Sequence, residues 1–427
     1  MKKSLIISLV IALILILILG FKFISLSKDK QSSDFENKFL EIDDKPSNIE
    51  NKPLEQESES QTNEPNKNAI SSGCQGTGIV NLTSPPVPIE QIGFIQPMGL
   101  MITSHVTPTD HQYYSPKNFR MSSEITLNDL TDVLAPADGI ITEIGRMPDF
   151  FAVKNSAFKD YRIIMHYTCD LYTIFIHVYQ LSPEIEEQLK DLAPGNSKQV
   201  SIPVKSGQKI GKANVLDFSL HNNKEILAGF IVPEHYKREP WKIHAVDPFD
   251  YFVEPVKSQL LEKSLRETEP FGGKIDHDID GKLIGNWFVE NTKGYQGIKE
   301  PQYWETHVSF SPDALDPTYF LISLGDFKGN AKQFGSKSNS PNPKDVDLNS
   351  EKIKYELVDF EYLDDKGAHW DRVSLINGIK AISSNQNIYG VVLVELIENR
   401  KLKLEIFPDK KASEISDFTD KAMIYER

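Results

Sequence analysis

The sequence has little cysteine. Its 427 residues include only Cys74 and Cys169. Two cysteines are too few for a zinc-binding cysteine cluster, and their spacing does not form a C-x-x-C pair. They leave two alternatives open: a single disulfide, if the body of the chain lies outside the cytoplasm, or two unpaired thiols.

Clusters of basic residues are also absent. The chain carries 47 Lys and Arg against 61 Asp and Glu, which gives a net charge of −14. Nucleic-acid binding requires clustered Lys and Arg to neutralise phosphates. We therefore expect no nucleic-acid partner.

One long apolar run is present, and it lies at the N-terminus. Residues 5–24 are apolar apart from Ser8, Gly20 and Lys22, which is enough for a helix across a hydrocarbon core of about 30 Å. A cleaved signal peptide would need a small-residue cleavage site, and the run ends without one. The sequence therefore predicts a single-pass anchor over residues 1–27, with the short N-terminal side inside the cell and the body outside.

Residues 28–72 are rich in Asn, Gln, Glu, Ser, Lys and Pro and contain few large apolar side chains. Such a composition cannot bury enough surface to offset the entropy of ordering. We expect a disordered acidic linker between the membrane and the body of the chain.

Residues 73–262 are expected to form the first folded domain. Between residues 133 and 221, short runs of alternating apolar residues are separated by Gly and Pro. This pattern is typical of strands joined in hairpins, so the sequence predicts an antiparallel β domain.

A polar segment of this domain contains His105, Asp110 and His111. Imidazole and carboxylate groups placed side by side can bind a divalent metal or transfer protons. On the residues alone, the favoured interpretation is a polar turn in which Asp110 caps the backbone and the histidines are surface residues. Further along, strand alternation places His177 on one face with Thr173, Phe175 and Tyr179.

The order of these motifs resembles the lysostaphin/LytM-type zinc metallopeptidases. The motifs are Ala135-Pro-Ala-Asp-Gly139, Tyr161-x-Ile-x-x-His166, Phe175-Ile-His-Val178, Val204-Lys-Ser-Gly-Gln-x-Ile-Gly211 and Leu216-Asp-Phe218. The resemblance covers about residues 93–252. It implies a duplicated hybrid motif of antiparallel sheets around a groove, and cleavage of peptide cross-links in cell-wall peptidoglycan by one bound zinc.

The resemblance also implies roles for particular residues. His177 matches the strand histidine that assists catalysis, and His105 with Asp110 matches the first zinc-binding pair at a spacing one residue too long. His111 is a further candidate. The family's His-x-His motif is incomplete, because it corresponds either to Val215 and Asp217 or to Ser219 and His221; strand alternation favours the first register.

The loss of one imidazole is shared with a degenerate branch of this superfamily, which Thr109-Asp-His-Gln-Tyr113 resembles closely. We therefore expect a membrane-tethered, extracytoplasmic protein that binds an envelope polymer or an envelope protein without hydrolysis, and no cofactor. The alternative is an active zinc endopeptidase with one zinc. Its ligands would be drawn from His105, Asp110, His111, Asp217 and His221. A lipoyl-type carrier is disfavoured because no Met-Lys-Met is present.

Residues 270–427 predict a second β-rich domain, a barrel or a sandwich. We expect a short linker helix over residues 259–268 and a long exposed loop over residues 328–350. Strands are expected at residues 283–290, 305–310, 319–324, 352–360, 388–396 and 401–407.

Overall fold

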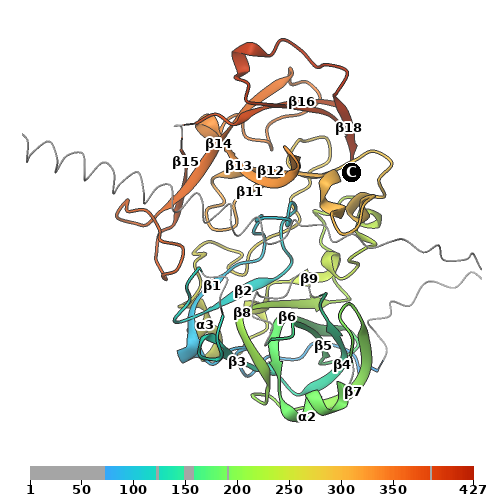
Figure 1. Cartoon of the computed structure of the whole chain (residues 1–427), viewed down its shortest axis with the longest axis vertical. Helices are drawn as coiled ribbons and strands as arrows, with labels where there is room; N and C mark the ends of the chain where they lie inside the picture. Colours follow the sequence, from blue (N-terminus) through green and yellow to red (C-terminus); the bar gives the residue numbers. More distant parts are fainter. Residues whose placement is uncertain (1–72, 122–124, 149–157, 190–191, 385–386) are drawn as a thin grey trace, which may run out of the picture. The chain divides into compact units, whose positions relative to one another are not determined.

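The computed structural model describes residues 73–427, except for residues 122–124, 149–157, 190–191 and 385–386 (Figure 1). Residues 66–427 belong to one compact unit. The expected anchor over residues 1–27 and nearly all of the expected linker lie outside the described residues. In the described part, no helix combines the length and the apolar character needed to cross a membrane.

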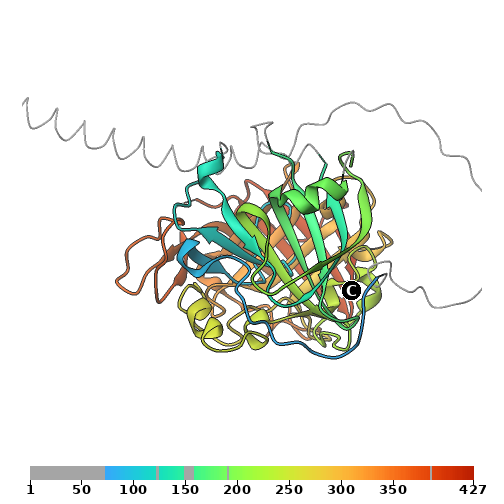
Figure 2. The same ribbon diagram turned by 90° about the horizontal axis from the view of Figure 1, so that it is seen from below.

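The first sheet has nine strands among the described residues. They are β1 (Ile92–Gln96), β2 (Gln112–Pro116), β3 (Thr131–Leu134), β4 (Gly139–Arg146), β5 (Tyr161–His166), β6 (Leu171–Leu181), β7 (Ser197–Val204), β8 (Lys209–Asn222) and β9 (Ala245–Val246). The order is β1-β2-β8-β6-β5-β4-β7, and β3 and β9 also pair with β8. Figure 2 shows the cyan and green strands of this sheet side by side. The expected antiparallel hairpins are confirmed.

The centre of the first sheet is the long strand β8, which pairs with β2, β3, β6 and β9. The turn before it contains Gly207 at φ +75°, a conformation that glycine adopts without steric cost. Phe175, Val178 and Phe218 are fully buried in one apolar core with residues of β1 to β9. The face of β8 that points away from this core is therefore available for a site.

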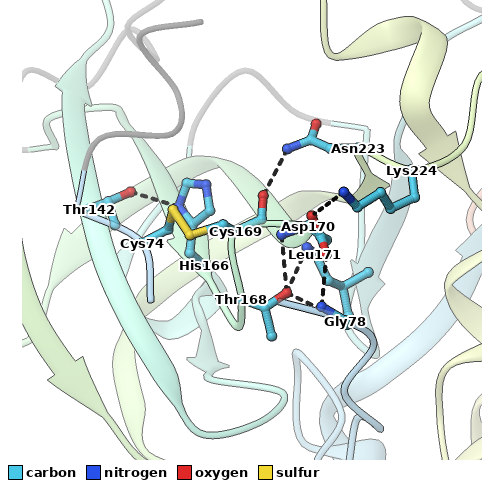
Figure 3. The surroundings of a disulfide bond; sticks show 10 residues. All are labelled: Cys74, Gly78, Thr142, His166, Thr168, Cys169, Asp170, Leu171, Asn223 and Lys224. Carbon is cyan, nitrogen blue, oxygen red and sulfur yellow. Dashed lines mark hydrogen bonds and ion pairs between the residues drawn. A yellow bond between two sulfur atoms is a disulfide. The ribbon is translucent and has the colours of Figure 1, made fainter. Parts of the chain in front are cut away.

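Cys74 and Cys169 form a disulfide, which decides between the two alternatives left open by the sequence (Figure 3). The bond attaches the start of the described chain to the turn between β5 and β6. Gly78 adds to this attachment, because its N–H donates to Asp170 at 2.8 Å and its carbonyl accepts from Thr168 at 2.7 Å. The lead-in segment is thus fastened along the first sheet.

The second sheet also has nine strands among the described residues, and eight of them close into a barrel. The strands are β10 (Gly285–Val289), β11 (His307–Pro312), β12 (Phe320–Phe327), β13 (Asn330–Ser336), β14 (Ile353–Leu363), β15 (Lys380–Ser384), β16 (Gly390–Glu398), β17 (Lys401–Pro408) and β18 (Met423–Glu426). Pairing of β13 with β14 closes the ring, and β15 adds to β14 outside it. The core includes Trp287, Phe310 and Tyr355. The fold is therefore mainly β, as predicted, and the second sheet is a barrel.

Two expectations for this region were wrong. The predicted loop over residues 328–350 contains β13, which pairs with β12 directly after a tight turn. The linker helix is α3 (Val256–Leu261) and does not continue to residue 268, because the N–H of Leu265 donates to the carbonyl of Ile95 and draws the chain alongside β1. The other described α-helix is α2 (Pro183–Glu186).

The segment between β8 and β9 packs against the barrel. Phe230 and Tyr236 share a buried apolar cluster with Phe288 of β10 and with Tyr295. The Asn286 amide donates to the Tyr236 hydroxyl at 3.0 Å. The two sheets are thus joined through this segment, although the predicted domain boundaries at residues 262 and 270 stay a prediction.

Candidate binding site

Asp110, His111 and Asp217 meet where β2 lies beside β8. Pairing of the two strands sets Tyr113 opposite Asp217. His111 lies between the two carboxylates, with Nδ1 at 3.2 Å from Asp110 Oδ1 and Nε2 at 3.4 Å from Asp217 Oδ2. Nε2 also lies 2.9 Å from the Tyr113 hydroxyl. The two acids and His111 are buried, so this polar group lies inside the fold.

His177 extends this group from the neighbouring strand β6. Its Nε2 lies 3.5 Å from Asp217 Oδ2, and its Nδ1 lies 2.8 Å from Asp160 Oδ2. The result is a continuous series of five groups in which carboxylates and imidazoles alternate: Asp110, His111, Asp217, His177 and Asp160. The expectation that Asp217 and His177 face the same site is consistent with this arrangement.

The strand face predicted for His177 was wrong. A bulge interrupts the pairing of β6 with β8 between Ile176 and Val178, and His177 has a left-handed φ of 64°. The extra residue moves Val178 into the core with Phe175, while the His177 ring reaches Asp217. A non-glycine residue held in this backbone region is strained, and such strain is concentrated at functional sites.

The electrostatics of the group favour a positive charge on His111. Burial lowers the pKa of His111, but Asp217 and the hydrogen bond with Asp110 outweigh burial and raise that pKa above its usual value. Burial raises the pKa of Asp217. For Asp110, burial acts in the same direction, but Lys242 and His111 outweigh it and hold the pKa well below its usual range. Lys242 is buried, with Nζ 3.9 Å from Asp110 Oδ1.

The remaining two candidates, His105 and His221, differ in their availability as ligands, because a lowered pKa keeps His105 in the neutral form that can bind a metal. The His105 ring lies 5.5 Å from that of His111, and burial together with the charge of His111 lowers the pKa of His105 to about 3. His221 is fully buried and stacks on Tyr172. Its Nε2 lies 2.7 Å from Ser219 Oγ and its Nδ1 lies 3.0 Å from the Trp241 carbonyl oxygen. Both nitrogens of His221 therefore already have partners.

A catalytic zinc needs three protein ligands and an open position for water. No group of three His, Cys, Asp or Glu side chains with the geometry of a metal site occurs in the described part of the chain. A protonated His111 has no lone pair to offer a metal, and His221 is occupied by Ser219 and Trp241. As placed here, the donors do not fit a zinc ion. The ligand set named from the sequence stays a prediction for zinc analysis to test.

A pocket of about 320 Å³ opens beside this group. Its lining residues come from both the first sheet and the segment between β8 and β9. They are Asp110, His111, Met147, Arg162, Ile174, Ile176, Asp217, Ser219, Arg238, Glu239 and Trp241. The volume lies at the lower end of the range for small-ligand pockets, although most of the lining side chains here are polar or charged, whereas such sites are typically mostly apolar.

The barrel holds one wall of the pocket in place. The Arg238 guanidinium pairs with both oxygens of the Glu300 carboxylate and lies 4.0 Å over the Tyr303 ring. Lys242 Nζ lies 5.2 Å from the centre of the Tyr295 ring. The pocket wall between residues 238 and 242 is therefore fastened to side chains that precede β11.

Sequence reasoning missed Asp160, Arg238, Glu239, Trp241 and Lys242. Asp160 directly precedes the predicted strand at Tyr161, and an acidic residue at a strand end was a usable signal. Trp241 follows a proline in a polar segment, where a large aromatic side chain is unexpected. No local pattern indicates that this segment returns to β8.

Comparisons with solved structures give distant likenesses, two of which are described here. No protein-family model and no curated protein matches the chain. The chain is similar to the structure of the SpoIIQ-SpoIIIAH pore forming complex, at 13% identity over 42% of this chain and 96% of that chain, with a TM-score of 0.25. It is also similar to the binding domain of Paraclostridial Mosquitocidal Protein 1, at 9% identity over 84% of this chain and 92% of that chain, with a TM-score of 0.18. We assign no function from either likeness.

Proposed function

We propose that this protein is held at the cell membrane by residues 1–27 and binds an envelope polymer in the pocket beside Asp217, without hydrolysing it. The observation that carries the proposal is the pocket itself. It lies over a buried series of acids and imidazoles in which His111 occupies the space between two carboxylates. The His111 ring lies between the two carboxylates, 3.2 Å from Asp110 Oδ1 and 3.4 Å from Asp217 Oδ2, in the space that a metal ion held by both acids would need.

Two features support placement of the body outside the cytoplasm. The disulfide between Cys74 and Cys169 is of the kind that persists in oxidising compartments. The apolar run at residues 5–24 is followed by a polar segment long enough to separate a membrane from the first sheet. The resemblance to lysostaphin/LytM-type domains agrees with a ligand in the cell envelope.

The active endopeptidase remains a second candidate because of one measurement. His111 Nε2 and His177 Nε2 lie 3.4 and 3.5 Å from the same oxygen of Asp217. Ligands at about 2.0–2.1 Å from a tetrahedral zinc are themselves separated by about 3.3 Å. Two of the separations among these groups are therefore those of zinc ligands, although the described residues do not form a complete metal site and His111 must be neutral before it binds zinc.

The test uses the full chain in detergent, with peptidoglycan and other insoluble envelope polysaccharides. We expect sedimentation with at least one polymer, no release of cross-link peptides, and much less than one zinc per chain after reconstitution. The control is Asp138→Asn, which changes an exposed carboxylate of the same sheet and should bind equally well. Stoichiometric zinc together with cleavage that His177→Ala abolishes would establish the endopeptidase instead. A folded chain that binds no polymer would leave a protein partner as the ligand.

A further inference from the structure

The disulfide lies at one end of a series of hydrogen bonds that leads to the pocket wall. Asp170 follows Cys169 in the turn between β5 and β6, and its carbonyl oxygen accepts from the N–H of Asn223 at 2.8 Å. The Asn223 side-chain amide donates to the Cys169 carbonyl at 3.1 Å. The Asp170 carboxylate pairs with Lys224 at 3.3 Å and accepts from the N–H of Gly78 (Figure 3). The Cys169 turn therefore holds the start of the segment between β8 and β9.

The same segment returns to form the pocket wall. The N–H of Leu227 donates to the carbonyl of Ile243 at 2.9 Å, and the Glu225 carbonyl accepts from His244 Nδ1. These two bonds join the first part of the segment to its last part, directly after Trp241, which lines the pocket. The pocket wall is therefore connected to the Cys169 turn through the first residues of its own segment.

The disulfide is placed where a thiol can reach it. Cys74 and Cys169 are both partly exposed, and residues 75–79 of the lead-in segment are exposed. Thiol–disulfide exchange requires this access, because a thiolate must attack one of the two sulfurs. After reduction, hydrogen bonds such as that from the Thr168 hydroxyl to the Gly78 carbonyl remain. Each contributes about 0.5–1.5 kcal/mol, whereas a disulfide typically contributes about 2–4 kcal/mol.

We propose that the disulfide between Cys74 and Cys169 is a redox-sensitive latch on the pocket wall. The intact bond keeps the lead-in segment on the Cys169 turn, and the turn holds Asn223 and Lys224. A protein dithiol that reduces the bond becomes a disulfide itself, and both cysteines become thiols. The released turn then loosens the wall and weakens binding in the pocket. The loosening of the wall stands independently, whereas the effect on binding rests on the proposed function.

The experiment measures hydrogen exchange in the full chain in detergent, with the disulfide intact and after reduction with dithiothreitol. The probes are the amides of Asn223 and Leu227. We expect their exchange to become about tenfold faster on reduction, which corresponds to about 1.4 kcal/mol of local opening free energy. The amides of β16 should keep their rates. In Cys74→Ser/Cys169→Ser, exchange should already be fast and should not respond to dithiothreitol.

A second variant tests the connection with the disulfide left intact. Asp170→Asn removes the charge that pairs with Lys224 and should accelerate exchange at Asn223 by a smaller factor. Sedimentation with peptidoglycan, before and after reduction, then measures the effect on binding. We expect the reduced chain to bind about threefold more weakly or worse, which corresponds to about 0.65 kcal/mol.

The possible failures are distinct. Unchanged exchange at Asn223 and Leu227, in a chain whose mass confirms that both thiols are reduced, overturns the latch. Equal acceleration throughout the first sheet overturns it too, because the bond would then stabilise the domain as a whole. Faster exchange with unchanged sedimentation overturns the effect on binding. Absence of sedimentation in both forms overturns the proposed function, while hydrogen exchange still decides whether the wall is latched.

Discussion

The two sheets bury carboxylates in opposite ways. Asp313, at the end of β11, is 2% exposed, and both of its oxygens have partners: Oδ1 accepts from the N–H groups of Leu315 and Asp316, and Oδ2 accepts from the Tyr362 hydroxyl at 2.5 Å. Asp217, in the first sheet, is similarly buried but leaves Oδ1 without a partner in the described structure.

This difference separates a carboxylate whose two oxygens are both satisfied by the fold from one whose second oxygen is not. Buried polar groups in folded proteins are almost always hydrogen-bonded, and an exception requires an explanation. Asp313 closes a turn of the barrel, so its burial is explained by the fold alone. For Asp217 the described residues supply no partner to Oδ1. The comparison therefore depends on whether both carboxylate oxygens have hydrogen-bond partners, since the exposed fraction of the residue is nearly the same at both positions.

The largest expected effect is the loss of stability in Asp313→Ala. That substitution leaves three donors without an acceptor, each at a cost of about 1–3 kcal/mol. We expect the free energy of unfolding to fall by about 3–5 kcal/mol, as measured in urea. The matched variant Asp217→Ala should lose less, about 1–3 kcal/mol, because it removes the Oδ2 contacts with His111 and His177 but also an unsatisfied oxygen. Equal losses in the two variants would show that Asp217 is structural too.

The disulfide provides the second test, because it constrains the first sheet alone. It closes a span of 95 residues. Replacing both cysteines with serine should lower the free energy of unfolding by about 2–4 kcal/mol. Hydrogen exchange should become faster around Gly78 and the turn between β5 and β6, with little change in the barrel. Uniform acceleration across both sheets would instead show that the two unfold together.

The sequence was sufficient for the class of fold, and it named candidate site residues that stay a prediction. Alternating apolar residues separated by Gly and Pro indicated the hairpins, and the register favoured at Phe218 placed Asp217 as a site residue. The bulge at His177 could not be predicted from the sequence, because one extra residue in a strand leaves the apolar–polar alternation on each side of it intact. Short strands such as β15 and β18 carry too few residues to show a period.

The pocket was beyond sequence reasoning for a different reason. Its walls combine β6, β8 and the segment of Trp241, and that segment is held by Glu300 and Tyr303 from the second domain. No periodicity links residues separated by this much chain. The candidate residues could therefore be named one by one from the sequence. That they line the same pocket could be seen only in the folded structure.

The smallest expected effect is a change of stability with pH, and it tests the charge on His111. Asp217 and Asp110 raise the pKa of His111 in the folded chain above its value in the unfolded chain. Protonated His111 therefore contributes stability that is complete below about pH 6.5 and is lost as the pH rises through the folded pKa. The contribution is about 1.4 kcal/mol for each unit by which the pKa is raised. We expect urea unfolding between pH 6 and pH 9 to show this loss in the native chain and a flatter profile in His111→Gln. Asp138→Asn should keep the native slope, because the pKa of Asp138 lies below its usual value and outside this range. A native profile that stays flat would mean that His111 is neutral, which would restore its lone pair and favour the zinc-binding alternative.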